Sequence, residues 1–410
     1  MVLFVCGTPG KSTLATDGTP VWIQSQVATV SPGFSITTPD FAFNHHGTAS
    51  IAWSAFQSTV GSNTVFRSEL SGLGIWSHHT VTTGSGAGLQ AALAFDRAEQ
   101  PTVAWINADG SVQAQFNDGP IGTVAATATA NVMQPALSLS YDLAGDLRGA
   151  FNGVAPGNLF DISEAAGIYA SNSITTFPAV DSVIDLDLTT DNAGLGHIIA
   201  RSVLPSSSQA VMIASQPSFG GNWSSAILTT ADAINGVAIT TDPTDGNVAL
   251  AYTTFDTATN TSELKYAKSN GTSLITTTVL SSTTEVFQDL DLAFDFSDGR
   301  PTIAYERQVT ATAAEHMMFA FLDAVQLWQT SLVDATISLE DPLGGLRGPS
   351  LAFDDFGTSF PAIAYVDSDE SLVVSFDPPI PEPATFALLL IGAVLGMRPS
   401  RSWRGFLNYR

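Results

Sequence analysis

Cysteine is almost missing from this 410-residue sequence: Cys6 stands alone, so no disulfide can form within the chain. Lysine is also scarce, and Lys and Arg together number 14 against 38 Asp and Glu. The resulting formal net charge of −24 repels phosphate backbones, so we expect no nucleic-acid partner. A fold with this composition must be held together by packing alone.

The common catalytic and nucleotide-binding motifs are missing as well. Gly7–Thr13 reads "GTPGKST", but Val5 stands where a phosphate-binding loop needs its first glycine. The sequence contains no G-x-S-x-G nucleophile elbow, no EF-hand calcium loop and no S-x-D-x-G-x-x-W box typical of sialidases. Because no catalytic constellation stands out, we assign no catalytic residue and expect a binding protein rather than an enzyme.

Turn-forming residues are abundant instead. The chain has 34 glycines and 21 prolines, whereas charged residues make up only 13% of it. This profile is typical of many short strands joined by many turns. With 44% apolar residues, the chain can bury a sizeable core.

One phrase recurs along the chain at a period of roughly 45–60 residues, which indicates a repeat architecture. It is clearest as "PSLAFDDFGTSFPAIAYVD" at Pro349–Asp367. The six other copies are Pro39–Ser54, Ala91–Asn107, Leu137–Asn152, Leu186–Ala200, Val237–Tyr252 and Leu290–Glu306. The copies in the middle of the chain are the weakest, so six or eight units remain alternatives to seven.

Each copy predicts a β-hairpin. A strand such as "LAF" is followed by an Asp or Asn, whose side chain can accept nearby backbone N–H groups and start a turn. These turn residues are Asn44, Asp96, Asp142, Asp191, Asp242, Asp295 and Asp354. Two more strands follow in most copies, without a helix between them. Four strands per unit at this period predict an all-β fold, a β-propeller of seven four-stranded blades.

The tryptophans indicate which strand of a blade each segment forms. Trp76, Trp223 and Trp328 fall where the fourth strand of a blade should begin, and Trp22 sits in a similar phrase with no three strands before it. The last copy has the opposite defect, because it ends near Asp377 after three strands. We therefore expect the N-terminal strand to complete the last blade and close the ring.

The end of the chain differs from the repeats. We divide the sequence into an unassigned segment 1–13, a propeller 14–377 and a tail 378–410. The prolines around Pro381 cannot continue a sheet, and Ala384–Met397 is an apolar run suited to a short transmembrane helix of about 21 Å. Arginines follow this run. Basic residues stay on the cytoplasmic side of a membrane, which places the propeller outside.

This tail resembles the PEP-CTERM sorting signal of exported bacterial proteins. The resemblance rests on three parts in order: Pro381-Glu382-Pro383, the apolar run, and Arg398, Arg401 and Arg404. It implies a Gram-negative envelope, recognition by an exosortase, transient membrane anchoring, and a final place at the cell surface or in the exopolysaccharide and biofilm matrix. It also implies an N-terminal export signal. "MVLFVCGTPGKS" is too short for one, so we expect that signal upstream of this start.

Acidic residues gather at the predicted start of several inner strands. They are Asp40, Asp185, Asp187, Asp289 and Asp291, and the last four belong to two "DLDL" strings. Alternation along a strand places both carboxylates of a string on one side. We expect these residues near the central channel. They are candidates for binding a ligand or a hard cation such as calcium, although solvated carboxylates would fit equally well.

Three functions remain open from the sequence. The first is a non-enzymatic platform that binds polysaccharide. The second is a hydrolase of envelope or matrix glycans, which would need two carboxylates at a defined separation. The third is a scaffold for protein partners. No cofactor is expected in any of them, with calcium as the one candidate ion.

Overall fold

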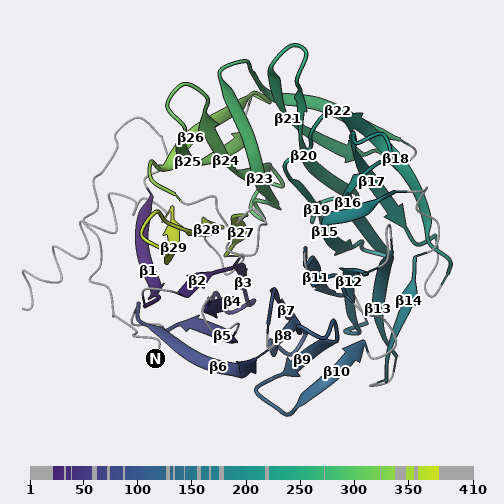
Figure 1. The fold of residues 1–410 in the computed structure, drawn as a ribbon, viewed down its shortest axis with the longest axis vertical. Helices are drawn as coiled ribbons and strands as arrows, with labels where there is room; N and C mark the ends of the chain where they lie inside the picture. The colour runs from purple at the N-terminus through teal and green to yellow at the C-terminus, as the bar shows by residue number, and fades with distance from the viewer. Residues whose placement is uncertain are drawn as a thin grey trace, which may run out of the picture. The chain divides into compact units, whose positions relative to one another are not determined.

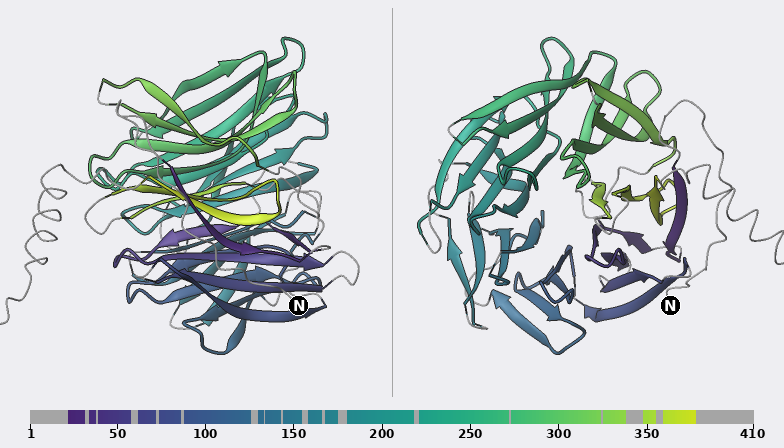
Figure 2. Two further views of the ribbon diagram at one scale, coloured as in Figure 1. Left: turned by 90° about the vertical axis from the view of Figure 1, so that its left-hand side faces the viewer. Right: turned by 180° about the vertical axis from the view of Figure 1, so that it is seen from behind.

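The computed structural model describes residues 22–31, 34–37, 39–57, 62–71, 74–85, 88–125, 130–132, 134–142, 144–154, 158–165, 168–174, 180–217, 221–271, 273–323, 325–337, 348–354 and 359–377. All secondary-structure elements in these ranges are β-strands. They form seven antiparallel sheets around a common centre (Figures 1 and 2). The fold is therefore a seven-bladed β-propeller, as the repeats predict.

We number the blades in chain order, and the first strand of each blade lies innermost. Blade 1 contains β2 (Phe34–Ile36), β3 (Asp40–Phe43), β4 (Ala49–Gln57), β5 (Ser62–Leu70) and β6 (Trp76–Ser85). Blade 2 contains β7 (Ala91–Phe95), β8 (Pro101–Ile106), β9 (Val112–Phe116) and β10 (Ile121–Ala125). Blade 3 contains β11 (Leu137–Tyr141), β12 (Leu147–Asn152), β13 (Leu159–Ala165) and β14 (Ile168–Ser173).

The remaining blades repeat this layout. Blade 4 contains β15 (Ser182–Thr190), β16 (Gly196–Val203), β17 (Gln209–Ser215) and β18 (Ser224–Ala231). Blade 5 contains β19 (Val237–Thr241), β20 (Val248–Asp256), β21 (Thr261–Ser269) and β22 (Leu274–Ser282). Blade 6 contains β23 (Glu285–Phe294), β24 (Pro301–Val309), β25 (Ala314–Leu322) and β26 (Trp328–Asp334). Blade 7 contains β27 (Ser350–Phe353), β28 (Pro361–Val366), β29 (Ser371–Phe376) and β1 (Ile23–Thr29).

The N-terminal strand closes the ring, which confirms the prediction from the two incomplete ends of the repeat. β1 pairs antiparallel with β29, from Ile23 opposite Phe376 to Thr29 opposite Ser371. Blade 7 thus takes three strands from one end of the described chain and one from the other. This pairing covers the edge that β29 would otherwise expose.

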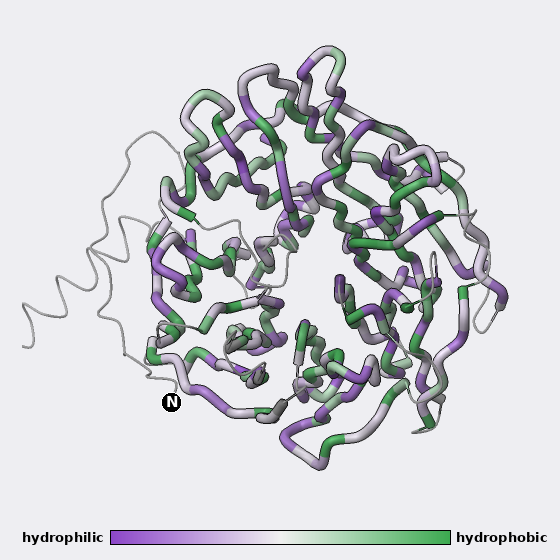
Figure 3. Tube along the Cα trace, in the orientation of Figure 1, coloured by the Kyte–Doolittle hydropathy of each residue, from purple (hydrophilic) through white to green (hydrophobic). Residues whose placement is uncertain are grey.

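The core lies between the blades rather than within them. Along the strands hydrophobic and hydrophilic residues alternate (Figure 3). In the described residues the buried side chains form seven clusters, one for each pair of neighbouring blades. Trp53, Trp105, Tyr305 and Tyr365 are at most 1% exposed, so the aromatic residues of the second strands fill these interfaces.

The tryptophans of the fourth strands reach back to the preceding blade. Trp76 begins β6, and its Nε1 donates to Ser25 Oγ of blade 7 at 3.1 Å. Trp22 lies just before β1 and packs edge-on against Phe319 of blade 6. These contacts confirm the register assigned from the sequence.

The predicted turn residues support the hairpins. Asp191 Oδ1, for example, accepts the backbone N–H groups of Ala193 and Leu195 at 2.8 and 2.9 Å. The equivalent residues make the same kind of bond in five other blades: Asn44, Asp96, Asp142, Asp242 and Asp295. The turn after Asp354 lies outside the described residues.

Two features of the fold were not predicted from the sequence. The inner edge of blade 1 is split into β2 and β3, which both pair with β4. In six blades the pairing of the third and fourth strands is interrupted by a β-bulge, and blade 3 alone pairs them without one.

All described residues belong to the unit Met1–Asp377, and Pro378–Arg410 forms a second unit of the chain. The expected apolar helix 384–397, the proline motif and the arginines lie outside the described residues, as does segment 1–13. The part of the chain that the structure describes contains no helix that could span a membrane.

Candidate functional site

A cavity of about 380 Å³ lies at the centre of the ring. Its lining includes residues that come just before the inner strands, among them Gln90, Gln134 and Pro349. The cavity therefore lies at the end of the channel where the inner strands begin. Its volume falls in the usual range for small-ligand pockets.

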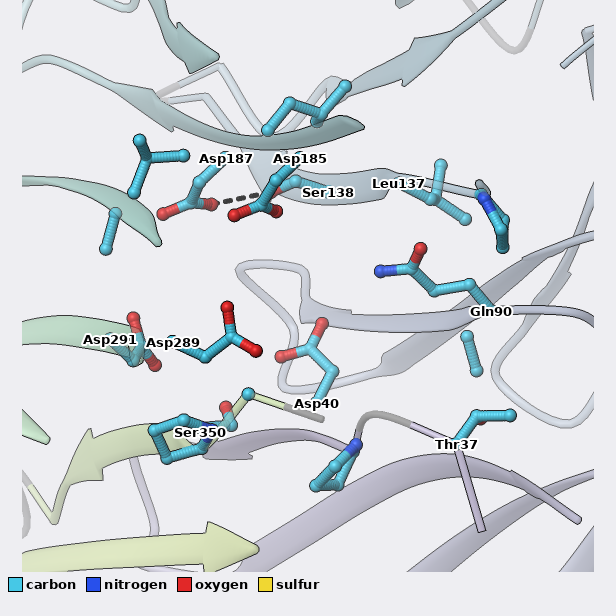
Figure 4. A pocket seen from close by; sticks show the side chains of 18 of the residues that line it. Thr37, Asp40, Gln90, Leu137, Ser138, Asp185, Asp187, Asp289, Asp291 and Ser350 are labelled. Carbon is cyan, nitrogen blue, oxygen red and sulfur yellow. Dashed lines mark hydrogen bonds between the residues drawn. The ribbon is translucent and has the colours of Figure 1, made fainter. Parts of the chain in front are cut away.

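The structure brings all five predicted acidic residues to this cavity. Asp185 and Asp187 lie on one side, and Asp40, Asp289 and Asp291 lie across from them (Figure 4). Arg201 of β16, which pairs with Asp185 in the sheet, lines the same wall. The expectation that these acids meet near the central channel is thus fulfilled.

Three of the acids are engaged in joining the blades. Asp40 Oδ2 accepts the N–H of Leu93 in blade 2 at 2.7 Å. In the same way Asp187 Oδ2 accepts the N–H of Ile239 in blade 5 at 2.9 Å, and Asp291 Oδ2 that of Leu351 in blade 7 at 2.7 Å. Each bond runs from an inner strand to the inner strand of the next blade. We call such a bond a clasp where it is made by the residue four positions before the Asp or Asn of the turn.

Serine does the same at two other junctions. Ser138 Oγ accepts the N–H of Leu188 at 3.1 Å, and Ser350 Oγ accepts the N–H of Phe41 at 2.9 Å. The five clasp residues all stand four positions before the Asp or Asn of their turn. Their location has a simple physical reason: an inner strand is an edge strand on its channel side, and its N–H groups there need acceptors.

The remaining acids, Asp185 and Asp289, stand two residues before a clasp residue in the two "DLDL" strings. Asp289 is buried, with 7% of its surface exposed, and Asp185 is partly buried. Beside Asp185 lies Arg201, whose buried Nε has no hydrogen-bond partner among the described residues. Asp185 also accepts the backbone N–H of Val237 in blade 5. Asp185, Asp289 and Arg201 line the cavity together with the glutamines Gln90 and Gln134.

Burial raises the pKa of the channel acids. The loss of water and, to a smaller extent, the charge of Asp187 raise the pKa of Asp291 to about 8. Burial also raises the pKa of Asp40 to about 7 and that of Asp185 to about 6, although the Arg201 charge opposes the second shift. Burial also raises the pKa of Asp187. At neutral pH the ring therefore carries fewer charges than it has carboxyl groups.

A metal site does not follow from this gathering of acids. Within the described ranges, no three His, Cys, Asp or Glu side chains are placed so that they could hold a metal ion. One reason is visible in the geometry, since Asp40, Asp187 and Asp291 direct an oxygen at the next blade. Calcium, the candidate ion from the sequence, therefore gains no support from the arrangement.

The described residues do not assemble an arginine cluster of the sialidase type at the cavity either. Arg201 is the one arginine lining the cavity among the described residues. Arg307 instead pairs with Glu285 at 3.3 Å, and Arg347 lies outside the described residues.

One group in blade 4 has the composition of a hydrolytic triad. His197 Nδ1 lies 2.9 Å from Ser215 Oγ, and its Nε2 lies 3.1 Å from Asp191 Oδ2. In blade 3, however, Arg148 occupies the equivalent position and bonds the turn residue Asp142 at 3.3 Å. A basic side chain that supports the turn aspartate is therefore a shared structural device, and we assign no chemistry to the group.

Comparisons with known proteins support the fold. No protein-family model matches the chain, and no curated protein matches it. A solved structure of a protein of unknown function from Dyadobacter fermentans is 9% identical and covers 86% of this chain and 97% of its own, with a TM-score of 0.54.

Two further solved structures are less similar. AofleA from Arthrobotrys oligospora is 12% identical, covers 73% of this chain and 89% of its own, and has a TM-score of 0.44. The Aleuria aurantia lectin in complex with Fucα1-6GlcNAc is 11% identical, covers 69% of this chain and 89% of its own, and has a TM-score of 0.42. At these identities the likeness concerns the propeller fold alone.

Proposed function

We propose that this protein is an exported surface or matrix protein whose β-propeller binds polysaccharide without cleaving it. The observation that carries the proposal is the polar cavity at one end of the channel. Its acids, its amides and the guanidinium of Arg201 converge from five blades, and hydroxyl groups of sugars need such a mixture of acceptors and donors.

The ligand-facing groups in this proposal are polar side chains that line the cavity outside the clasp positions. Asp185 and Asp289 supply acceptors, Arg201 supplies donors, and Gln90 and Gln134 supply both. The clasp residues shape the wall of the cavity behind them. A neutral or weakly charged glycan suits this site, because burial already disfavours charge there.

Export and sorting are proposed from the tail alone. Pro381-Glu382-Pro383, the apolar run and the arginines would be recognised by an exosortase, after a stage in which the tail anchors the protein in the membrane. In this proposal the propeller lies outside the cell. A surface location would bring the cavity into contact with exopolysaccharide.

The binding claim is tested by mixing the purified full-length protein with exopolysaccharide from the host, with and without calcium. Co-sedimentation and new reducing ends are measured in the same tubes. We expect co-sedimentation that is independent of calcium, without new reducing ends. New reducing ends would make the protein a glycan hydrolase, and failure to bind would leave a scaffold for protein partners.

The sorting claim has a separate test. C-terminal peptides of the protein from its host are identified by mass spectrometry. We expect them to end near Pro383. Intact protein ending at Arg410 in the membrane fraction would contradict processing while leaving the binding proposal untouched.

A further inference from the structure

The clasps do not run all the way round the channel. At the junctions of blades 1/2, 3/4, 4/5, 6/7 and 7/1 the residue four before the turn is Asp or Ser, and each bonds the next blade. At the junctions 2/3 and 5/6 the equivalent residues are Ala92 and Ala238. Alanine carries no acceptor, so neither side chain can form a clasp.

We propose that the propeller consists of two clasped arcs that move relative to each other along two seams. The seams are the junctions 2/3 and 5/6. They divide the ring into an arc of blades 3, 4 and 5 and an arc of blades 6, 7, 1 and 2, which closes through β1. The inference goes beyond the proposed function and stands without it.

The seams are held by packing, with polar contacts away from the clasp positions. The apolar clusters at 2/3 and 5/6 are as complete as those elsewhere. At 2/3 the hydroxyls of Thr102 and Tyr141 lie 2.7 Å apart, at the far end of the inner strands. At 5/6 Ser262 Oγ accepts the N–H of Phe287 in β23 at 3.0 Å, and Asn235 Nδ2 donates to the carbonyl oxygen of the same residue at 3.3 Å. Apolar contacts are non-directional, so they permit small sliding movements that a directed hydrogen bond resists.

The seams also separate the two groups of channel acids. Asp185 and Asp187 belong to the arc of blades 3 to 5, whereas Asp40, Asp289 and Asp291 belong to the other arc. Figure 4 shows the two groups facing each other across the cavity. Movement along the seams therefore changes the width of the cavity, because its two acidic walls belong to different arcs.

Spin labels on equivalent turns can test this movement. Ala98, Ala144 and Ala193 are exposed residues of the first turns of blades 2, 3 and 4, and each is the second residue after its turn aspartate. Cysteines are introduced pairwise in the full-length protein, with Cys6 replaced by serine. The pair 98/144 spans a seam, and the pair 144/193 spans a clasped junction of the same geometry. Pulsed electron paramagnetic resonance gives the distance distribution of each pair.

We expect the distribution across the seam to be about twice as wide as that across the clasped junction. Adding Ala92→Ser should narrow the distance distribution of the pair 98/144, because the new hydroxyl can accept the N–H of Leu139. Equal widths for the two pairs, or a seam unaffected by a folded Ala92→Ser protein, would overturn the proposal.

A second variant keeps the test decisive if Ala92→Ser does not fold. Asp40→Ala removes the clasp at junction 1/2, and labels at His46 and Ala98 report on it. This distribution should broaden toward that of the seam pair. An unchanged width in Asp40→Ala would show that clasps do not restrain the blades and would reject the account.

Discussion

Two neighbouring junctions, one between blades 4 and 5 and one between blades 5 and 6, are built alike. Each joins two four-stranded antiparallel sheets through an apolar cluster. At the channel wall they differ in the residue at the clasp position. Asp187 of blade 4 accepts the N–H of Ile239, whereas the side chain of Ala238 in blade 5 carries no hydrogen-bond acceptor. The comparison shows that acids at this position can be explained by the needs of a neighbouring strand, before any ligand is considered.

The comparison also separates the two aspartates of each "DLDL" string. The second aspartate of each string, Asp187 or Asp291, is bonded to the next blade. The first, Asp185 or Asp289, faces the cavity. Only the second aspartate of each string stands at a clasp position, although Asp185 also accepts the backbone N–H of Val237 in blade 5.

The largest effect is expected from Asp187→Ala. The change removes the acceptor of both Ile239 N–H and Ser138 Oγ–H, and leaving buried donors without partners should cost about 2–3 kcal/mol of unfolding free energy. Urea unfolding at pH 6 measures it. Asp187→Asn is the matched control and should keep most of the stability, because its amide oxygen still accepts the Ile239 N–H. Equal losses in both variants would contradict the clasp.

A pH dependence is expected from Asp291. Its pKa is raised to about 8, so the folded state favours the protonated carboxyl. This contribution to stability is fully present below the unfolded pKa and is lost as the pH rises through about 8. The unfolding free energy of the wild type should therefore fall more steeply from pH 5 to pH 9 than that of Asp291→Asn, which keeps the acceptor but cannot ionise. Parallel pH profiles for the two proteins would refute the assignment.

A smaller loss is expected from Ser350→Ala at the junction of blades 7 and 1. Its Oγ accepts the N–H of Phe41, and removing one neutral hydrogen bond should cost about 1 kcal/mol. Thermal and urea unfolding measure the change. An unchanged unfolding free energy in Ser350→Ala would contradict this role, because it would mean that water takes the place of the serine hydroxyl without loss of stability.

The smallest effect, a gain, is expected from Ala238→Ser. The new hydroxyl would face the inner strand of blade 6, where Asp291 Oδ1 already accepts the N–H of Leu292. Because that donor has a partner, the gain should stay near 0.5 kcal/mol in urea unfolding. A loss above 1 kcal/mol would show that the alanine is required for packing.

Much of the fold could be predicted from the sequence. The repeats gave the blade number, because each copy carries its own turn residue. Trp22 revealed the closing strand, because a fourth-strand tryptophan without three strands before it needs a partner elsewhere. The split of β2 and β3 and the β-bulges could not be predicted, since they depend on how neighbouring strands twist and pair rather than on a residue pattern.

The candidate site was predicted in position but not in role. Alternation placed both aspartates of each string near the channel, as observed. The clasps were missed because Ser138 and Ser350 do not look like Asp40, and the common feature is their distance from the turn residue. Aligning the seven copies on that residue would have revealed it. The unpartnered Nε of Arg201 depends on three-dimensional surroundings that no spacing reports.

The central claim is that the clasp residues build the ring while Arg201 and the groups beside it contact the ligand. The most direct measurement compares the affinity of host exopolysaccharide for Arg201→Met and Asp187→Asn, with the melting temperature of each variant as a check on folding. The account predicts that Arg201→Met weakens binding about tenfold or more and that Asp187→Asn binds as the wild type does, since losing a charged hydrogen-bond donor costs about 1.5–3 kcal/mol. Weakened binding in Asp187→Asn alone, or unchanged binding in both folded variants, would contradict it.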